Sequence, residues 1–71
     1  SRKHVFAYYN RGLVRSEKGD LDGAIADYTE VVRLDPTAAD AYNNRGIARM
    51  KRGDVEGAIA DFTEAIRIDP K

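Results

Sequence analysis

The side chains best suited to acid–base chemistry are four carboxylates at helical spacing, Asp27, Glu30, Asp61 and Glu64. Paired carboxylates act as general acid and base when their environments separate their pKa values. On the solvated face of a helix, however, such residues usually supply solubilising charge. His4 is the only histidine, and the chain has no cysteine and no glycine-rich phosphate loop. We therefore predict that the chain is not an enzyme and holds no metal or cofactor.

Charged side chains alternate in blocks along the chain, although the 12 basic and 12 acidic residues cancel overall. Residues 1–19 carry five basic and one acidic side chain, 20–35 one and five, 36–52 four and one, and 53–71 two and five. One interpretation is a basic groove that binds acidic peptides. The other is electrostatic pairing between neighbouring helices.

Helical geometry favours pairing. At about 100° per residue, Arg11 and Arg15 lie on the same side as Tyr8, which is expected to face the next helix. The predicted partners are Asp27 and Glu30 for Arg11 and Arg15, and Asp61 and Glu64 for Arg45 and Arg49. We expect these pairs to be exposed and to contribute only about 0.2 to 1 kcal/mol each.

The opposite face of the same basic segments has the composition of a binding surface. Scattered exposed apolar residues need no explanation, but a contiguous apolar patch does. Two asparagines could add bidentate hydrogen bonds to a peptide backbone. The predicted peptide-binding residues are Phe6, Tyr9, Asn10, Leu13, Asn43, Asn44, Ile47, Met50 and Lys51. The alternative is ordinary solvated surface.

One stretch that occurs twice in the sequence contains most of these side chains. Residues 41–70 align with residues 7–36 after a shift of 34 residues without a gap. A fixed period of this length is typical of a repeat array. The apolar pattern of each copy's second segment agrees, whereas the predicted binding positions differ almost everywhere, as ligand-facing positions should within a duplicated scaffold. We do not expect these positions to be used for packing.

Each copy predicts two helices, at about 4–18 and 21–34 in the first copy and at about 38–52 and 55–68 in the second. The second and fourth are amphipathic, with apolar residues at three- and four-residue spacing. Gly19 and its counterpart Gly53 should end the helices before them in the left-handed conformation. An Asp-Pro pair should end each of the other two helices.

Two local features complete this prediction. Thr37 and Asp40 are placed as a capping box that would start the third helix. Gly23 and Gly57 lie in the first turns of the second and fourth helices, where each costs about 1 kcal/mol relative to alanine. Either a neighbouring backbone approaches closely there or both glycines descend from one duplicated ancestor.

The paired residues resemble the tetratricopeptide repeat family, whose unit is a 34-residue helix-turn-helix. The residues that carry the resemblance are Tyr8 and Tyr42, Gly12 and Gly46, Gly19 and Gly53, Ala24 and Ala58, Tyr28 and Phe62, and Pro36 and Pro70. The resemblance implies an all-α fold: a lead-in at 1–4, then two tandem hairpins at 5–38 and 39–71 that begin a right-handed superhelix. Gly12 and Gly46 would let paired helices approach closely while aromatic side chains fill the remaining space.

The resemblance also implies a protein–protein interaction module that binds a peptide or helix on the concave surface of the first helices. Arg11 and Arg45 replace the leucine usual in the family, so packing should be thinner there. Tyr9 and Leu13 stand where a carboxylate clamp would need a lysine and an asparagine, which argues against that clamp. The alternative function is self-association, because the exposed outer face of the fourth helix should be covered by a third repeat or a second copy.

The balanced charge lowers the expectation of nucleic-acid or membrane binding. An RNA-contacting repeat is a weaker alternative, which a steep salt dependence of binding would reveal. No apolar run approaches a spanning length, and the chain start lacks the apolar core of a signal peptide. We expect a soluble chain, with the cytoplasm slightly favoured over other compartments. Because it begins at Ser1 and stops just after the second Asp-Pro, we also expect it to be part of a longer protein.

Overall fold

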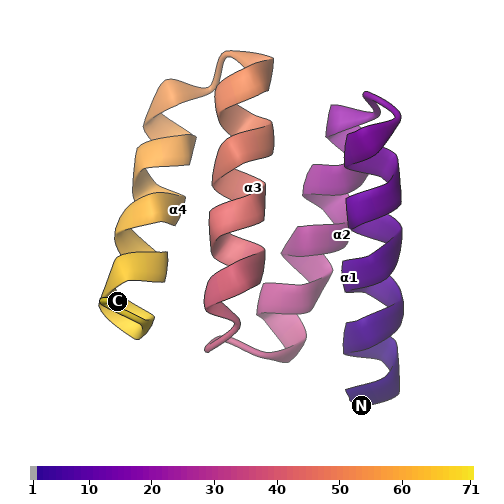
Figure 1. Cartoon of the computed structure of the whole chain (residues 1–71), viewed down its shortest axis with the longest axis horizontal. Helices are drawn as coiled ribbons and strands as arrows, with labels where there is room; N and C mark the ends of the chain where they lie inside the picture. Colours follow the sequence, from indigo (N-terminus) through magenta and orange to yellow (C-terminus); the bar gives the residue numbers. More distant parts are fainter. Residues whose placement is uncertain (1) are drawn as a thin grey trace.

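The computed structural model describes residues 2–71 as four helices joined by short turns (Figure 1). They are α1 (Arg2–Glu17), α2 (Leu21–Leu34), α3 (Ala39–Arg52) and α4 (Val55–Ile68). Each helix packs against its neighbour in sequence, so that α1 with α2 and α3 with α4 form two hairpins side by side. The predicted all-α fold of two helical hairpins is confirmed.

Glycine ends the first helix of each hairpin, as predicted. Gly19 and Gly53 have φ values of 83° and 94°, in the left-handed region that side chains disfavour. The backbone N–H of Asp54 donates to the carbonyl of Arg49 at 2.8 Å, and that of Gly53 donates to Met50 at 3.0 Å. This pair of bonds is a Schellman motif, which satisfies carbonyl groups that the helix end leaves open.

An aspartate caps the second helix of each hairpin. Asp20 accepts a hydrogen bond from the backbone N–H of Gly23 at 3.0 Å, and Asp54 accepts one from Gly57 at 3.0 Å. A Cβ atom added at Gly23 or Gly57 would lie 2.2 Å from an oxygen of its own capping carboxylate. These glycines therefore leave room for the cap, and the atoms nearest to an added Cβ belong to side chains.

We predict that Asp54→Ala lowers the free energy of unfolding by about 1 kcal/mol, because the amide of Gly57 loses its partner. Urea denaturation followed by circular dichroism measures the change. Thr37→Ala is the control, since Thr37 caps no helix and its loss should change stability by less than half as much. Equal effects of the two substitutions would contradict the assigned cap.

The predicted capping box before the third helix is wrong. The N-cap of α3 is Ala38, which has no side chain able to cap, and the helix starts at Ala39. Asp35 lies in extended backbone before the proline, and its carboxylate binds Thr37. The hydroxyl and backbone N–H of Thr37 donate to Asp35 at 2.8 and 3.1 Å, so the threonine side chain is not used as a cap. The first helix also differs from its prediction, since it begins at Arg2 and ends at Glu17.

Small side chains dominate the core. Four alanines are at most 1% exposed, as are Tyr28 and Val31 between them. A Cβ atom added at Gly12 would lie 2.7 Å from the ring of Tyr28, and one at Gly46 would lie 2.7 Å from the ring of Phe62. The predicted close approach at the two glycines is therefore confirmed, and in each hairpin an aromatic ring of the second helix occupies the space.

Candidate partner-binding surface

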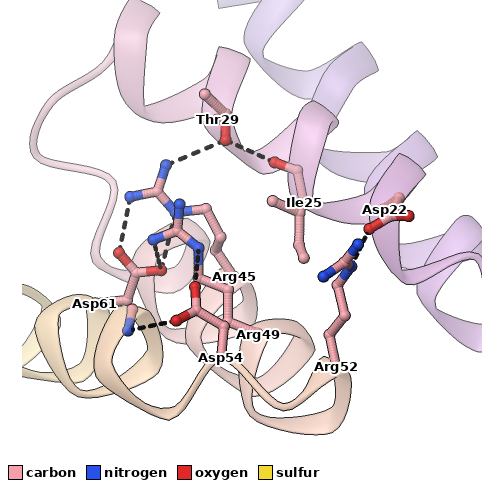
Figure 2. A network of polar contacts seen from close by, with 9 residues as sticks. Asp22, Ile25, Thr29, Arg45, Arg49, Arg52, Asp54 and Asp61 are labelled. Carbon is pink, nitrogen blue, oxygen red and sulfur yellow. Dashed lines mark hydrogen bonds and ion pairs between the residues drawn. The ribbon is translucent and has the colours of Figure 1, made fainter.

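Each hairpin buries one aspartate between two arginines. Asp27 and Asp61 are 2% and 3% exposed. Arg45 donates to the two carboxylate oxygens of Asp61 at 2.9 and 2.7 Å, and Arg49 adds a third bond at 2.9 Å (Figure 2). In the first hairpin, Arg11 binds both oxygens of Asp27 at 3.0 and 2.8 Å. The bidentate geometry offsets the cost of burying each carboxylate.

The predicted pairing of the first-helix arginines is confirmed for these two aspartates, including Arg15, which lies 3.3 Å from Asp27. It is wrong for Glu30 and Glu64. Each glutamate lies three residues further along the helix and instead binds an arginine of its own helix, Arg33 or Arg67. The expectation that the aspartate pairs are exposed is also wrong.

Arginines engaged in this way are poor candidates for a basic groove. The guanidinium groups of Arg11 and Arg45 also lie 5.7 and 5.5 Å from the ring centroids of Tyr8 and Tyr42, a cation–π geometry. The hydrogen bond and charge of Asp27 raise the pKa of Arg11. These first-helix cations thus join the helices of their own hairpin.

Most of the predicted binding residues are exposed. We call them the stripe, and its apolar members Phe6, Leu13, Ile47 and Met50 are 60%, 36%, 39% and 43% exposed. Tyr9 and Asn44 are half-buried. The exposed polar members are Asn10, Asn43 and Lys51. The stripe runs along α1 and α3, the first helices of the two hairpins.

Tyr9 and Asn44 differ from the other stripe residues because they join the hairpins. The Asn44 amide donates to the Tyr9 hydroxyl at 2.9 Å. The Tyr9 ring lies 6.0 Å from that of Tyr28 at an angle of 56°. The expectation that no stripe residue takes part in packing is wrong for these two, since they also position α1 against α3.

A cleft of about 420 Å³ opens beside the start of the stripe. Phe6 and Tyr9 line it from α1, the segment leading into α3 provides small side chains, and Ile68 closes it from the end of α4. The other lining residues are Val5, Val31, Thr37, Ala38, Ala39, Asp40, Ala41 and Asp69. The cleft is large enough for an apolar side chain and adjoins exposed apolar residues.

The repeat, the paired hairpins and the glycine–aromatic contacts point to one family, and comparison with family models agrees. The tetratricopeptide repeat model matches residues 9–71. The chain belongs to the tetratricopeptide repeat family. Tetratricopeptide repeats are generally protein–protein interaction modules and are typically non-catalytic. Comparison with curated proteins gave no match.

The two tetratricopeptide repeats are also joined by polar contacts that were not predicted. Arg45 donates to the hydroxyl of Thr29 at 3.2 Å, and Arg52 donates to Asp22 (Figure 2). Both bonds run from α3 to α2, across the junction between the repeats. The sequence held a signal for the second bond, because the end of α3 is basic and the start of α2 is acidic. The charge pattern alone, however, does not say that these two helix ends meet.

The glutamates bound within their own helices give these repeats a pH signature. The hydrogen bond and charge of Arg33 lower the pKa of Glu30, against a smaller opposing effect of burial. A carboxylate with a lowered folded-state pKa stabilises the fold above its unfolded pKa and loses this contribution as the pH falls through the folded pKa. We predict that Arg33→Gln raises the pKa of Glu30 toward its ordinary value, as measured by NMR titration.

The same titration contains its own control. Arg67 lowers the pKa of Glu64 in the same way one repeat later, and Arg33→Gln leaves this pair intact. The pKa of Glu64 should therefore stay unchanged in the variant. An unchanged pKa of Glu30 would show that the pair with Arg33 does not form in solution.

None of the helices described over residues 2–71 has the length and apolarity needed to cross a lipid bilayer. In the same part of the chain, no three His, Cys, Asp or Glu side chains lie together as a metal site would require.

Proposed function

We propose that the chain binds an extended or helical peptide of another protein along the stripe. The observation that carries the proposal is the exposure of four large apolar side chains on the adjacent helices α1 and α3, beside an open cleft. A peptide whose apolar side chains recur on one face would cover Leu13 and Ile47 together. This mode of recognition places a partner segment in a groove between packed helices.

Charge decides the chemistry of the preferred peptide. Since the arginines that could recognise acidic side chains hold Asp27 and Asp61, apolar contacts dominate the stripe. One apolar side chain of the peptide would occupy the cleft beside Phe6 and Tyr9. The exposed amides of Asn10 and Asn43 would bind the peptide backbone, and Lys51 would favour an acidic group at one end.

Selection from a random peptide library displayed on phage, with the whole chain as bait, tests this proposal. Binding of a selected peptide is then measured by fluorescence anisotropy for the chain and for the double variant Leu13→Ala, Met50→Ala. We expect the double variant to bind at least about tenfold more weakly, because residues at the centre of an interface carry most of the affinity. Tyr9 is not substituted, since its ring packs on Tyr28.

Ile59→Ala provides the matched control, because Ile59 is 56% exposed on α4 and lies outside the stripe. This variant should bind the selected peptide as tightly as the original chain. Circular dichroism checks that all variants remain helical. Equal affinities of the double variant and the control would place binding elsewhere on the molecule, and NMR shifts confined to α4 would do the same.

A further inference from the structure

The internal junction between the repeats has a counterpart at each end of the molecule. At the junction, α3 packs against the first hairpin and buries Ala41 and Ala48 to 0% and 1% exposure. The residues 34 positions earlier, Ala7 and Val14 of α1, are exposed. The first hairpin covers α3, but within residues 2–71 no other segment covers the same face of α1. This face of α1 is therefore an unfilled copy of the junction.

The outer face of α4 is the complementary copy. Tyr28 and Val31 of α2 are 1% exposed beneath α3, whereas their counterparts Phe62 and Ala65 are half-buried. Ile66, the counterpart of the half-buried Val32, is 63% exposed. A hollow of about 410 Å³ lies at this outer face, between α3 and α4. Its lining residues are Ala39, Asp40, Asn43, Phe62, Ala65, Ile66, Asp69 and Lys71.

The residues that make polar contacts at the junction have counterparts of similar chemistry at the two ends of the molecule. Arg52 binds Asp22 at the junction, and the corresponding end residues are Lys18, in the turn just after α1, and Glu56 on α4, which keep the signs of charge. The side chain of Arg45 is 12% exposed, whereas that of its counterpart Arg11 is 55% exposed.

The hydrogen bonds have counterparts as well. Arg45 donates to Thr29 at the junction, and the end residues in these places are Arg11 and the exposed Thr63. Asn44 donates to Tyr9 at the junction, and the corresponding end residues are the exposed Asn10 and Asn43.

We propose that two copies of the chain associate head to tail, with α1 of one copy in the hollow formed by α3 and α4 of the other. The occupant is a second copy because α1 offers the apolar, amide and cationic groups that this face meets at the internal junction. The contact joins two different surfaces, so it is heterologous and can extend to a third copy. The balanced net charge of the chain does not oppose it.

The register of the proposed contact makes one demand on the chain ends. Two periods of 34 residues place residues 2 and 3 of the second copy over residues 70 and 71 of the first. The first turn of α1, which begins at Arg2, must therefore unwind or move aside. Unwinding this turn should cost little free energy, since the turn has no acidic side chain to stabilise it at the positive end of the helix dipole. A chain lacking residues 1–3 should associate more tightly.

Two variants, each blocked at one face, test the proposal. Val14→Glu places a charge on the α1 face and Ile66→Glu places one on the α4 face, at side chains 48% and 63% exposed, so neither should unfold the chain. We expect the original chain to gain mass with concentration in sedimentation velocity from micromolar to millimolar protein, and each variant to associate at least about tenfold more weakly. An equimolar mixture of the two variants should form a dimer that grows no further.

The stripe variant Leu13→Ala is the matched control and should associate like the original chain, which separates self-association from peptide binding. A strict monomer at every concentration would overturn the proposal. Association undiminished in both blocked variants would also overturn it, as would the absence of a dimer in their mixture, because only a head-to-tail contact leaves each variant one usable face.

Discussion

Replacing Asp61 with alanine is expected to lower the free energy of unfolding by about 3 kcal/mol or more. Asp61 is 3% exposed and accepts hydrogen bonds from two arginines of α3, whose side chains are only 12% and 26% exposed. Without the carboxylate, two guanidinium groups remain close together at a helix interface with little access to water. Urea denaturation of the variant and the original chain measures the loss.

Asp27→Ala is the matched comparison, because Asp27 holds the same position one repeat earlier. Its partners Arg11 and Arg15 are 55% and 36% exposed, so water can solvate them when the carboxylate is removed. We expect the substitution at Asp27 to be destabilising but less so than that at Asp61. The reverse order, or a loss below about 1 kcal/mol at Asp61, would show that the buried pairs are not the main tie between the helices.

Gly12→Ala is expected to destabilise the chain by about 1 to 3 kcal/mol, although alanine is the better helix former. The added Cβ would lie 2.7 Å from the ring of Tyr28, and that ring is 1% exposed with Tyr9 packed beside it. The ring has no room to move, so the helices must separate. Burial also raises the pKa of Tyr28. Thermal and urea unfolding of the variant measure the effect.

Gly46→Ala makes the same change one repeat later and serves as the comparison. The added Cβ would again lie 2.7 Å from an aromatic ring, that of Phe62, but Phe62 is only half-buried and borders the open hollow on the α4 side. Because this ring can shift outward, we expect a clearly smaller loss, offset in part by the gain in helix propensity of about 1 kcal/mol. Similar losses in both variants would mean that ring freedom does not decide the outcome.

Most of the fold could be predicted because the sequence states it twice. Gly19 and Gly53 mark the same turn, and Gly12 and Gly46 mark the same close contact, so each weak local signal is supported by its copy. The predicted capping box is wrong, and its threonine, Thr37, lies in the linker between the two copies, where local patterns compete. There the hydroxyl of Thr37 donates to the carboxylate of Asp35 and does not cap α3.

The candidate site was less predictable because helical spacing gives the direction of a side chain but not its reach. Spacing placed Arg11 and Arg15 toward the acidic helix, but it left both Asp27 and Glu30 as partners. Only Asp27 is bound by these arginines, whereas Glu30 pairs with Arg33 of its own helix. Likewise, helical spacing puts Tyr9 on the stripe but does not show its ring contact with Tyr28 or its hydrogen bond from Asn44.

The unequal support of the two stripe helices has a consequence for any ligand. Helix α3 is held from both sides, whereas α1 rests on α2 and reaches α3 through the bond between Asn44 and Tyr9. A peptide lying across Leu13 and Ile47 would join α1, a terminal helix, to α3, which packs between two helices. Occupancy of the stripe would thus raise the melting temperature of the whole chain, so that recognition and folding draw on the same free energy.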